Sequence, residues 1–196
     1  RINYNMFGSV TGRLTDGESS FPILTLHKKY REIIKPKNDW IVELDLNAAE
    51  LRVAQALLGK EQVEGDYHEW CAKNIMNSEV KRAEAKSAAT QWLYNSKSAL
   101  ATRFDKELSD FYKKDALLAM YWVDGKVHTP FGRQIEADEY HAISYLNQST
   151  LIDLFHRQII KADDYLMSKK SFISLLVHDS VVIDLADSEK SILPDI

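Results

Sequence analysis

The sequence has 196 residues, of which 45% are hydrophobic and 28% are charged. This composition is ordinary for a globular protein, and no apolar run is long enough to cross a bilayer, so no membrane partner is expected. Cys71 is the single cysteine and no signal peptide opens the chain, so nothing suggests a secreted, disulfide-bonded protein. We therefore expect an intracellular protein, in a bacterial or phage-infected cytoplasm or in an organelle.

The net charge of -4 does not by itself indicate nucleic-acid binding, because binding domains usually carry an excess of Lys and Arg. The basic residues do cluster in one place, at Lys28, Lys29, Arg31, Lys35 and Lys37. A solvated charged surface explains this cluster at least as well as a DNA contact does.

The first half of the chain is predicted to contain one strand followed by three helices. Residues 40–46 have the aromatic and β-branched content of a buried strand, with Asp45 near its end. From Ala48 to Gly59 the apolar residues recur at helical spacing, which predicts a helix directly after the strand. Two further helices are expected over residues 67–75, with Asp66 as N-cap, and over residues 78–97, with Ser78 as N-cap.

The second half is predicted to end in a β-hairpin. Residues 171–177 and 180–185 are two β-rich runs that meet at His178 and Asp179. The elements expected before this hairpin are an amphipathic helix over 100–121, a turn at Asp124-Gly125, a short strand over 127–129 and a long helix over 139–167.

Asp45 at a strand end and Asp179 at a hairpin tip could present two carboxylates at one edge of a sheet. Magnesium prefers oxygen ligands and usually takes one or two protein carboxylates, which leaves room for substrate phosphates. Two such ions could activate an attacking hydroxyl and stabilise a departing oxygen in phosphoryl transfer. Position alone is weak support, because aspartates at strand ends are usually turn formers.

The third predicted helix adds a cationic face. Its residues Arg82, Lys86, Thr90 and Tyr94 follow one another at steps of four, each about 40° around the helix from the last. An Arg and a Lys one turn apart suit a triphosphate, since Arg offers a bidentate fork and Lys a point charge that can donate a proton. A solvated basic helix face is the plainer explanation of the same pattern.

Three segments, in order, resemble the motifs of family A DNA polymerases, the DNA polymerase I type. Residues 45–52 read Asp-Leu-Asn-Ala-Ala-Glu-Leu-Arg and resemble motif A, an Asp followed by Glu-Leu-Arg. Arg82, Lys86 and Tyr94 have the spacing of motif B, and residues 177–179, Val-His-Asp, resemble motif C. Shorter matches lie around them, in residues 1–4, 11–14, 66–72, 129–133 and 148–150.

The resemblance implies a catalytic centre and a nucleotide pocket. Asp45 and Asp179 would hold two Mg²⁺ ions, with the backbone carbonyl of Leu46 as a further ligand. Lys86 would be the third catalytic residue, as the proton donor to pyrophosphate. The nucleotide site would consist of Arg82, Lys86 and His68 at the phosphates, Glu50 as steric gate under the sugar with Tyr94 as its hydrogen-bonding neighbour, and Thr90 beside the base.

The resemblance also implies the partners and the fold. Arg13, Gln148 and His178 would contact a DNA primer-template, and the substrates would be dNTPs. The expected class is α+β: a palm with an antiparallel sheet flanked by helices, and a reduced helical fingers subdomain, without a thumb. Its parts would be palm over 1–50, fingers over 51–125 and palm over 126–196. An upstream thumb and exonuclease part of the same polymerase and a processivity factor are the further partners considered.

Several positions depart from the family pattern. Thr90 stands where an aromatic residue usually stacks on the incoming base, and Gln91 replaces a Gly. Stacking contributes on the order of 1 to 3 kcal/mol per base, so we expect the absence of an aromatic ring at Thr90 to affect nucleotide affinity. Ser180 replaces an acid after the motif C Asp, and Ser144 an Asn.

Three alternatives remain open from the sequence. A single-subunit RNA polymerase shares the palm aspartates, but Glu50 fills the space that a ribose 2′-hydroxyl needs. A polymerase-derived palm that has lost catalysis could persist as a DNA-binding or structural module, although Asp45, Asp179, Arg82 and Lys86 are all retained. A two-carboxylate nuclease would leave the cationic helix face without a purpose.

Overall fold

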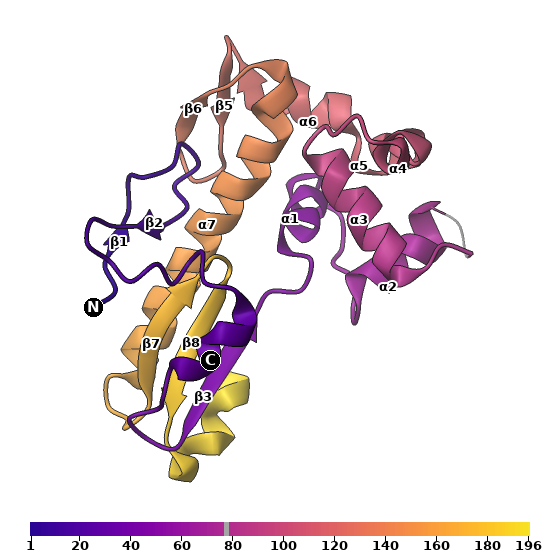
Figure 1. The fold of residues 1–196 in the computed structure, drawn as a ribbon. Helices are drawn as coiled ribbons and strands as arrows, with labels where there is room; N and C mark the ends of the chain where they lie inside the picture. The colour runs from indigo at the N-terminus through magenta and orange to yellow at the C-terminus, as the bar shows by residue number, and fades with distance from the viewer. Residues whose placement is uncertain (77–78) are drawn as a thin grey trace. The chain divides into compact units, whose positions relative to one another are not determined.

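The computed structural model describes residues 1–76 and 79–196, and its chain forms two compact units (Figure 1). The first unit combines residues 1–46 with 152–196, and the second contains residues 47–151. The class is α+β with antiparallel sheets flanked by helices, as expected. In the described part of the chain, no helix is both long and apolar enough to span a membrane.

A three-stranded antiparallel sheet organises the first unit. Its strands are β3 (Trp40–Asp45), β7 (Phe172–Val177) and β8 (Ser180–Leu185), in the order β3-β8-β7, so that the last strand lies in the centre. The predicted strand and the predicted hairpin are both confirmed. All six residues of β8 are buried, as a central strand with both faces covered requires.

Side chains cover both faces of this sheet. On one face, Ile152 and Phe155 of helix α7 (Glu139–Leu166) pack with alternate residues of β8. On the other face, Ile23 and Leu24 pack with Val182. The segment before β3 contains β1 (Tyr4–Asn5), β2 (Thr15–Asp16) and the 3-10 helix η1 (Lys28–Ile33), and the chain ends in the 3-10 helix η3 (Asp187–Asp195).

The hydroxyl of Tyr4 closes part of the free edge of β7. It donates to the carbonyl of Leu176 at 2.7 Å and accepts from the Leu176 amide at 2.9 Å. A side chain thus takes the place of the neighbouring strand that an edge residue lacks.

The second unit is mainly helical, and helix α3 (Arg82–Leu93) packs in its core. The buried cluster includes Leu51, Tyr67, Trp92 and Leu108. Around it lie α1 (Ala49–Leu57), α2 (Tyr67–Cys71), the π-helix η2 (Ala72–Met76), α4 (Ala99–Arg103), α5 (Asp105–Tyr112) and α6 (Lys114–Tyr121).

Two helix predictions need correction. The single helix expected over 100–121 is three helices, which are separated at Phe104 and at Lys113, where the backbone turns left-handed with φ of 47°. The helix expected over 78–97 runs only from Arg82 to Leu93, with Lys81 as N-cap. Ser78, the cap that was expected, lies outside the described residues.

A small second sheet consists of β4 (Trp122–Val123), β5 (Lys126–His128) and β6 (Gln134–Glu136). The predicted turn joins its first two strands, and both Asp124 and Gly125 have positive φ, of 52° and 72°. The sequence reading missed β4 and β6, since strands of two or three residues show no alternation to detect.

Candidate active site

Asp45 and Asp179 lie at the same end of the main sheet. The pairing of β3 with β8 ends at Asp45 opposite Ser180, and Asp179 directly precedes Ser180 in the hairpin turn. Opposed residues in an antiparallel pair have Cα atoms about 4.5 to 5.5 Å apart, so the two aspartates are close neighbours. The strand topology therefore brings together two residues that are far apart in the sequence.

The two carboxylates at this end of the sheet fit a hard cation that takes its remaining ligands from phosphates and water. Asp45 is exposed and Asp179 is half-buried, so both carboxylates can be reached from solvent. Across residues 1–76 and 79–196, no group of three or more His, Cys, Asp and Glu side chains could hold a metal ion. Two carboxylates with room for phosphates and water is the arrangement that Mg²⁺ accepts.

The turn that carries Asp179 has a constrained backbone. His178 has φ of 56°, a left-handed conformation that residues other than Gly adopt at a cost of about 1 to 3 kcal/mol. Its side chain is exposed at the hairpin tip. A positive φ at this position is typical of the tight turns that connect the two strands of a hairpin through a two-residue loop.

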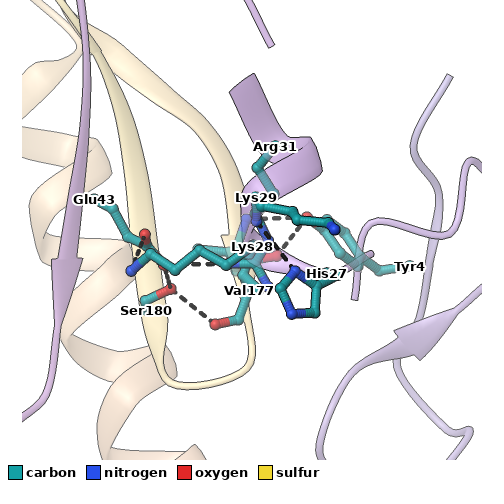
Figure 2. A network of polar contacts seen from close by, with 9 residues as sticks. Tyr4, His27, Lys28, Lys29, Arg31, Glu43, Val177 and Ser180 are labelled. Carbon is teal, nitrogen blue, oxygen red and sulfur yellow. Dashed lines mark hydrogen bonds and ion pairs between the residues drawn. The ribbon is translucent and has the colours of Figure 1, made fainter. Parts of the chain in front are cut away.

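A polar network beside the aspartates was not predicted from the sequence. Figure 2 shows Glu43 of β3 together with Lys28 and Arg31 of η1 and with Ser180 of β8. The Glu43 carboxylate lies 3.1 Å from Lys28 Nζ and 3.3 Å from Arg31 Nη1, and it accepts from Ser180 Oγ at 3.2 Å. The signal that could have found Glu43 is its spacing, since a residue two before Asp45 on a strand shares its face.

In the second unit, helix α3 buries one side and exposes the cationic side, as the sequence predicts. Ala85, Ala88 and Trp92 are buried. The exposed residues at steps of four are Arg82, Lys86, Thr90 and Tyr94, of which Tyr94 is the C-cap.

Arg82 is engaged in an ion pair with Asp66, the residue predicted as a helix cap and as the start of a family-like segment. Its Nε and Nη2 atoms lie 2.9 and 2.6 Å from the same carboxylate oxygen. The other oxygen of Asp66 accepts from the Glu69 amide at 2.9 Å, which confirms the predicted N-cap of α2. Hydrogen bonding to Arg82 lowers the pKa of the Asp66 carboxyl to about 2.

His68 lies buried near these cations. Its exposed fraction is 5%, and its Nδ1 atom is buried without a hydrogen-bond partner among the described residues. Burial, together with the positive charge of Lys86, lowers the pKa of the imidazole. A neutral imidazole is therefore expected at neutral pH, beside the two cations proposed for phosphate binding.

Three other predicted residues form a hydrogen-bonded row. Gln148 Nε2 donates to Tyr94 Oη at 2.8 Å, and Tyr94 Oη donates to Glu50 Oε1 at 2.8 Å. The hydrogen bond that the resemblance implies between Tyr94 and Glu50 is thus present. Gln148, expected to contact DNA, is joined to the same row.

The remaining predicted residues lie in the first unit. Arg13 is half-buried shortly before β2, and its carbonyl accepts from Ser9 Oγ at 3.0 Å. Leu46, directly after β3, has an exposed fraction of 43%.

Comparison with known proteins gives a match by structure. No family model matches the sequence, and no curated protein does. The fold matches the POL domain of Pol1 from M. smegmatis, solved in complex with DNA primer-template and dNTP, with a TM-score of 0.72. The chain has the fold of a part of that POL domain. The match has 17% sequence identity and covers 99% of this chain and 43% of that one, so the chain spans less than half of its structural relative.

Proposed function

We propose that this chain is the polymerising part of a family A DNA polymerase, which adds deoxynucleotides from dNTPs to a primer 3′ end on a DNA template. The observation that carries the proposal is the aspartate pair at one end of the sheet, in a chain with the fold of a POL domain. The motif residues that resemble family A, and their order along the chain, support the choice of family.

Asp45 and Asp179 would hold two Mg²⁺ ions, with the carbonyl of Leu46 as a further ligand. When bound, such ions activate an attacking hydroxyl and stabilise the leaving oxygen in phosphoryl transfer. The role of this chain is to fix both carboxylates at a strand end and at a tight turn, where few backbone torsions are free to change.

Arg82, Lys86 and His68 would bind the triphosphate. The planar guanidinium of Arg82 already holds one carboxylate through two nitrogens, and a phosphate can take that carboxylate's place. Lys86 is exposed and would donate a proton to the departing pyrophosphate. A neutral His68 would add a hydrogen bond without further positive charge.

Glu50 and Tyr94 would select the sugar, and Thr90 would lie at the base. The hydrogen bond from Tyr94 holds the Glu50 carboxylate in one orientation, which suits a steric gate against a 2′-hydroxyl. Thr90 offers no ring for stacking, so we expect weaker nucleotide binding than an aromatic residue would give. Arg13, Gln148 and His178 would contact the primer-template, with a thumb and exonuclease part and a processivity factor as further partners.

The deciding experiment is Mg²⁺-dependent primer extension by the natural protein that carries this chain. Asp45→Asn and Asp179→Asn should each lower the rate by about a thousandfold, since metal ions contribute several kcal/mol to such transition states. Asp163→Asn, which changes an exposed aspartate of α7, is the matched control and should keep full activity. Extension at the wild-type rate by Asp179→Asn would refute the proposal.

The same assay separates the alternatives. A preference for rNTPs over dNTPs would identify a single-subunit RNA polymerase. DNA binding without extension by any variant, wild type included, would identify a binding module that has lost catalysis.

A further inference from the structure

The Glu43 carboxylate joins three segments around the end of the sheet where the two aspartates lie. These segments are β3, the start of β8 and the 3-10 helix η1 (Figure 2). We propose that Glu43 is a positioning residue for Asp179, and that it acts through the hydroxyl of Ser180. This inference rests on the proposed function, because it presumes that Asp179 is a metal ligand.

Strand geometry places the Glu43 side chain on the same face of the sheet as Asp45. Glu43 and Asp45 are two residues apart on β3, and alternate residues of a strand point to the same side. Ser180 lies directly opposite Asp45 in the register, and directly opposed residues also share a face. All three side chains therefore lie on one face at the end of the sheet.

Ser180 connects the base of the hairpin turn to β3. Its hydroxyl lies 2.9 Å from the carbonyl of Val177 and 3.2 Å from Glu43 Oε1. Val177 and Ser180 are the pair that closes the turn of His178 and Asp179. The Ser180 side chain is 3% exposed, so its position is set by packing as well as by these acceptors. A restraint at Ser180 is passed to Asp179 through a single peptide unit.

Glu43 itself is held in place from the other side. Of its two cationic partners, Arg31 is the less exposed, with a side chain 20% exposed against 78% for that of Lys28. Exposed ion pairs contribute little, whereas a charge-assisted contact between partly buried groups fixes geometry. The path of positioning therefore runs from Arg31 through Glu43 and Ser180 to the turn.

The turn that carries Asp179 needs contacts of this kind because its backbone is strained. His178 has φ of 56°, which a residue with a Cβ adopts only at a cost, so the turn that carries Asp179 is strained. Contacts outside the turn must keep it in place. The hydrogen bond that Ser180 donates to Glu43 is such a contact, and Glu43 lies on the strand that carries the other aspartate.

The test uses Glu43→Gln, Ser180→Ala and Ser180→Thr in the natural protein. Glu43→Gln removes the charge that Arg31 holds, Ser180→Ala removes the hydroxyl, and Ser180→Thr restores it. The first two should raise the half-saturating Mg²⁺ concentration for primer extension by about tenfold or more, as loss of a group that orients a ligand does. The KM for dNTP should stay unchanged, and Ser180→Thr should behave as wild type.

A second readout does not depend on activity. Mn²⁺ binding without nucleotide, followed by electron paramagnetic resonance, should weaken in Glu43→Gln and Ser180→Ala but not in Ser180→Thr. The matched control is Glu32→Gln, an exposed acid of the same 3-10 helix as Lys28 and Arg31. If Glu43→Gln does not fold, as judged by thermal melting, the two Ser180 variants decide the question.

The two proposals can fail separately. If Asp179→Asn abolishes extension while Glu43→Gln and Ser180→Ala keep wild-type metal dependence, the positioning role is wrong and the polymerase function stands. Ser180→Thr behaving like Ser180→Ala would also overturn it. If Asp179→Asn extends primers normally, the proposed function fails first.

Discussion

At the scale of single residues, the hydroxyl of Tyr94 is the centre of the row that contains the proposed sugar gate. It donates to Glu50 and accepts from Gln148, each at 2.8 Å. Because one hydroxyl serves both neighbours, a change of one atom tests the whole row without removing the ring.

We expect Tyr94→Phe to loosen sugar selection. Tyr94→Phe removes the hydrogen bond that this hydroxyl donates to the Glu50 carboxylate, and the ratio of rNTP to dNTP incorporation should rise by about tenfold, since a hydrogen bond to a charged group contributes ~1.5 kcal/mol. Single-nucleotide extension kinetics with both substrates measure this ratio. Tyr140→Phe, in an exposed tyrosine of the same unit, should leave it unchanged. An unaltered ratio in Tyr94→Phe would show that Glu50 needs no support.

Asp66 has two structural tasks, as N-cap of α2 and as partner of Arg82. Its folded-state pKa of about 2 lies below the usual value of about 4 for an aspartate. A lowered pKa means that the ionised form stabilises the fold above pH ~4, and that this stability is lost as pH falls toward 2.

The corresponding prediction concerns stability at two pH values. Asp66→Asn keeps the cap but loses the charge, so it should reduce the wild-type loss of stability between pH ~4 and ~2. The pair is partly exposed, at 46% for the Arg82 side chain and 27% for that of Asp66, and the effect at pH 7 should not exceed about 1 kcal/mol. Asp66→Ala also loses the cap and should cost about 1 kcal/mol more. Urea unfolding at each pH measures these differences, and equal acid sensitivity of wild type and Asp66→Asn would contradict them.

At the scale of elements, the region from residue 105 to residue 121 shows how one backbone position divides a helical pattern. Lys113 ends α5 and begins α6 with φ of 47° and ψ of 54°. A left-handed residue with a Cβ costs roughly 1 to 2 kcal/mol, and Gly avoids that cost. The buried residues Leu108, Tyr112 and Leu117 fix the two helices on one core, and the backbone must bend between them.

We therefore expect Lys113→Gly to stabilise the chain by about 1 kcal/mol, in contrast to most glycine substitutions in helical regions. The control Glu107→Gly lies at an exposed position inside α5 and should destabilise it by about 0.5 to 1 kcal/mol. Chemical unfolding of both variants measures whether the free energy of unfolding rises in Lys113→Gly and falls in Glu107→Gly. A loss of stability in Lys113→Gly would mean that the left-handed turn is not retained in solution.

At the scale of the whole molecule, each unit has buried side chains of its own. Leu108 belongs to the helical core of residues 47–151, and Ile183 belongs to the sheet core of the first unit. Both are fully buried at 0% exposure. Truncation of either side chain should cost about 2 to 5 kcal/mol.

Because the two cores are separate, weakening one of them should reduce protection from hydrogen exchange mainly in its own unit. Leu108→Ala should speed hydrogen exchange mainly in residues 79–151, and Ile183→Ala mainly in β3, β7 and β8, because local opening follows the core that is weakened. Peptide-resolved exchange measures both variants, each of which serves as control for the other. Equal loss of protection in both units from either change would show that the chain opens as one cooperative body.

Elements with long, regular patterns could be predicted from the sequence alone. The strand with Asp45, the hairpin with Asp179 and the long helix before it were predicted because their side-chain periods are local properties of the chain. The exposed cationic side of α3 followed from the same period, with Ala85, Ala88 and Trp92 on the buried side. The motif residues came from resemblance, and their roles stay predictions.

Which of these residues meet depends on the tertiary structure, although the sequence already suggested that Asp45 and Asp179 could share one edge of a sheet. Strand order places Asp45 next to Asp179, and no local pattern encodes the pairing of residues 40–45 with 180–185. For the same reason, three features were not predicted from the sequence: the helix break at Lys113, the ion pair of Arg82 with Asp66 and the Glu43 network. Each depends on contacts between segments that the core brings together, and those contacts override local preference. The chain thus specifies its elements locally and assembles its proposed metal site only through packing.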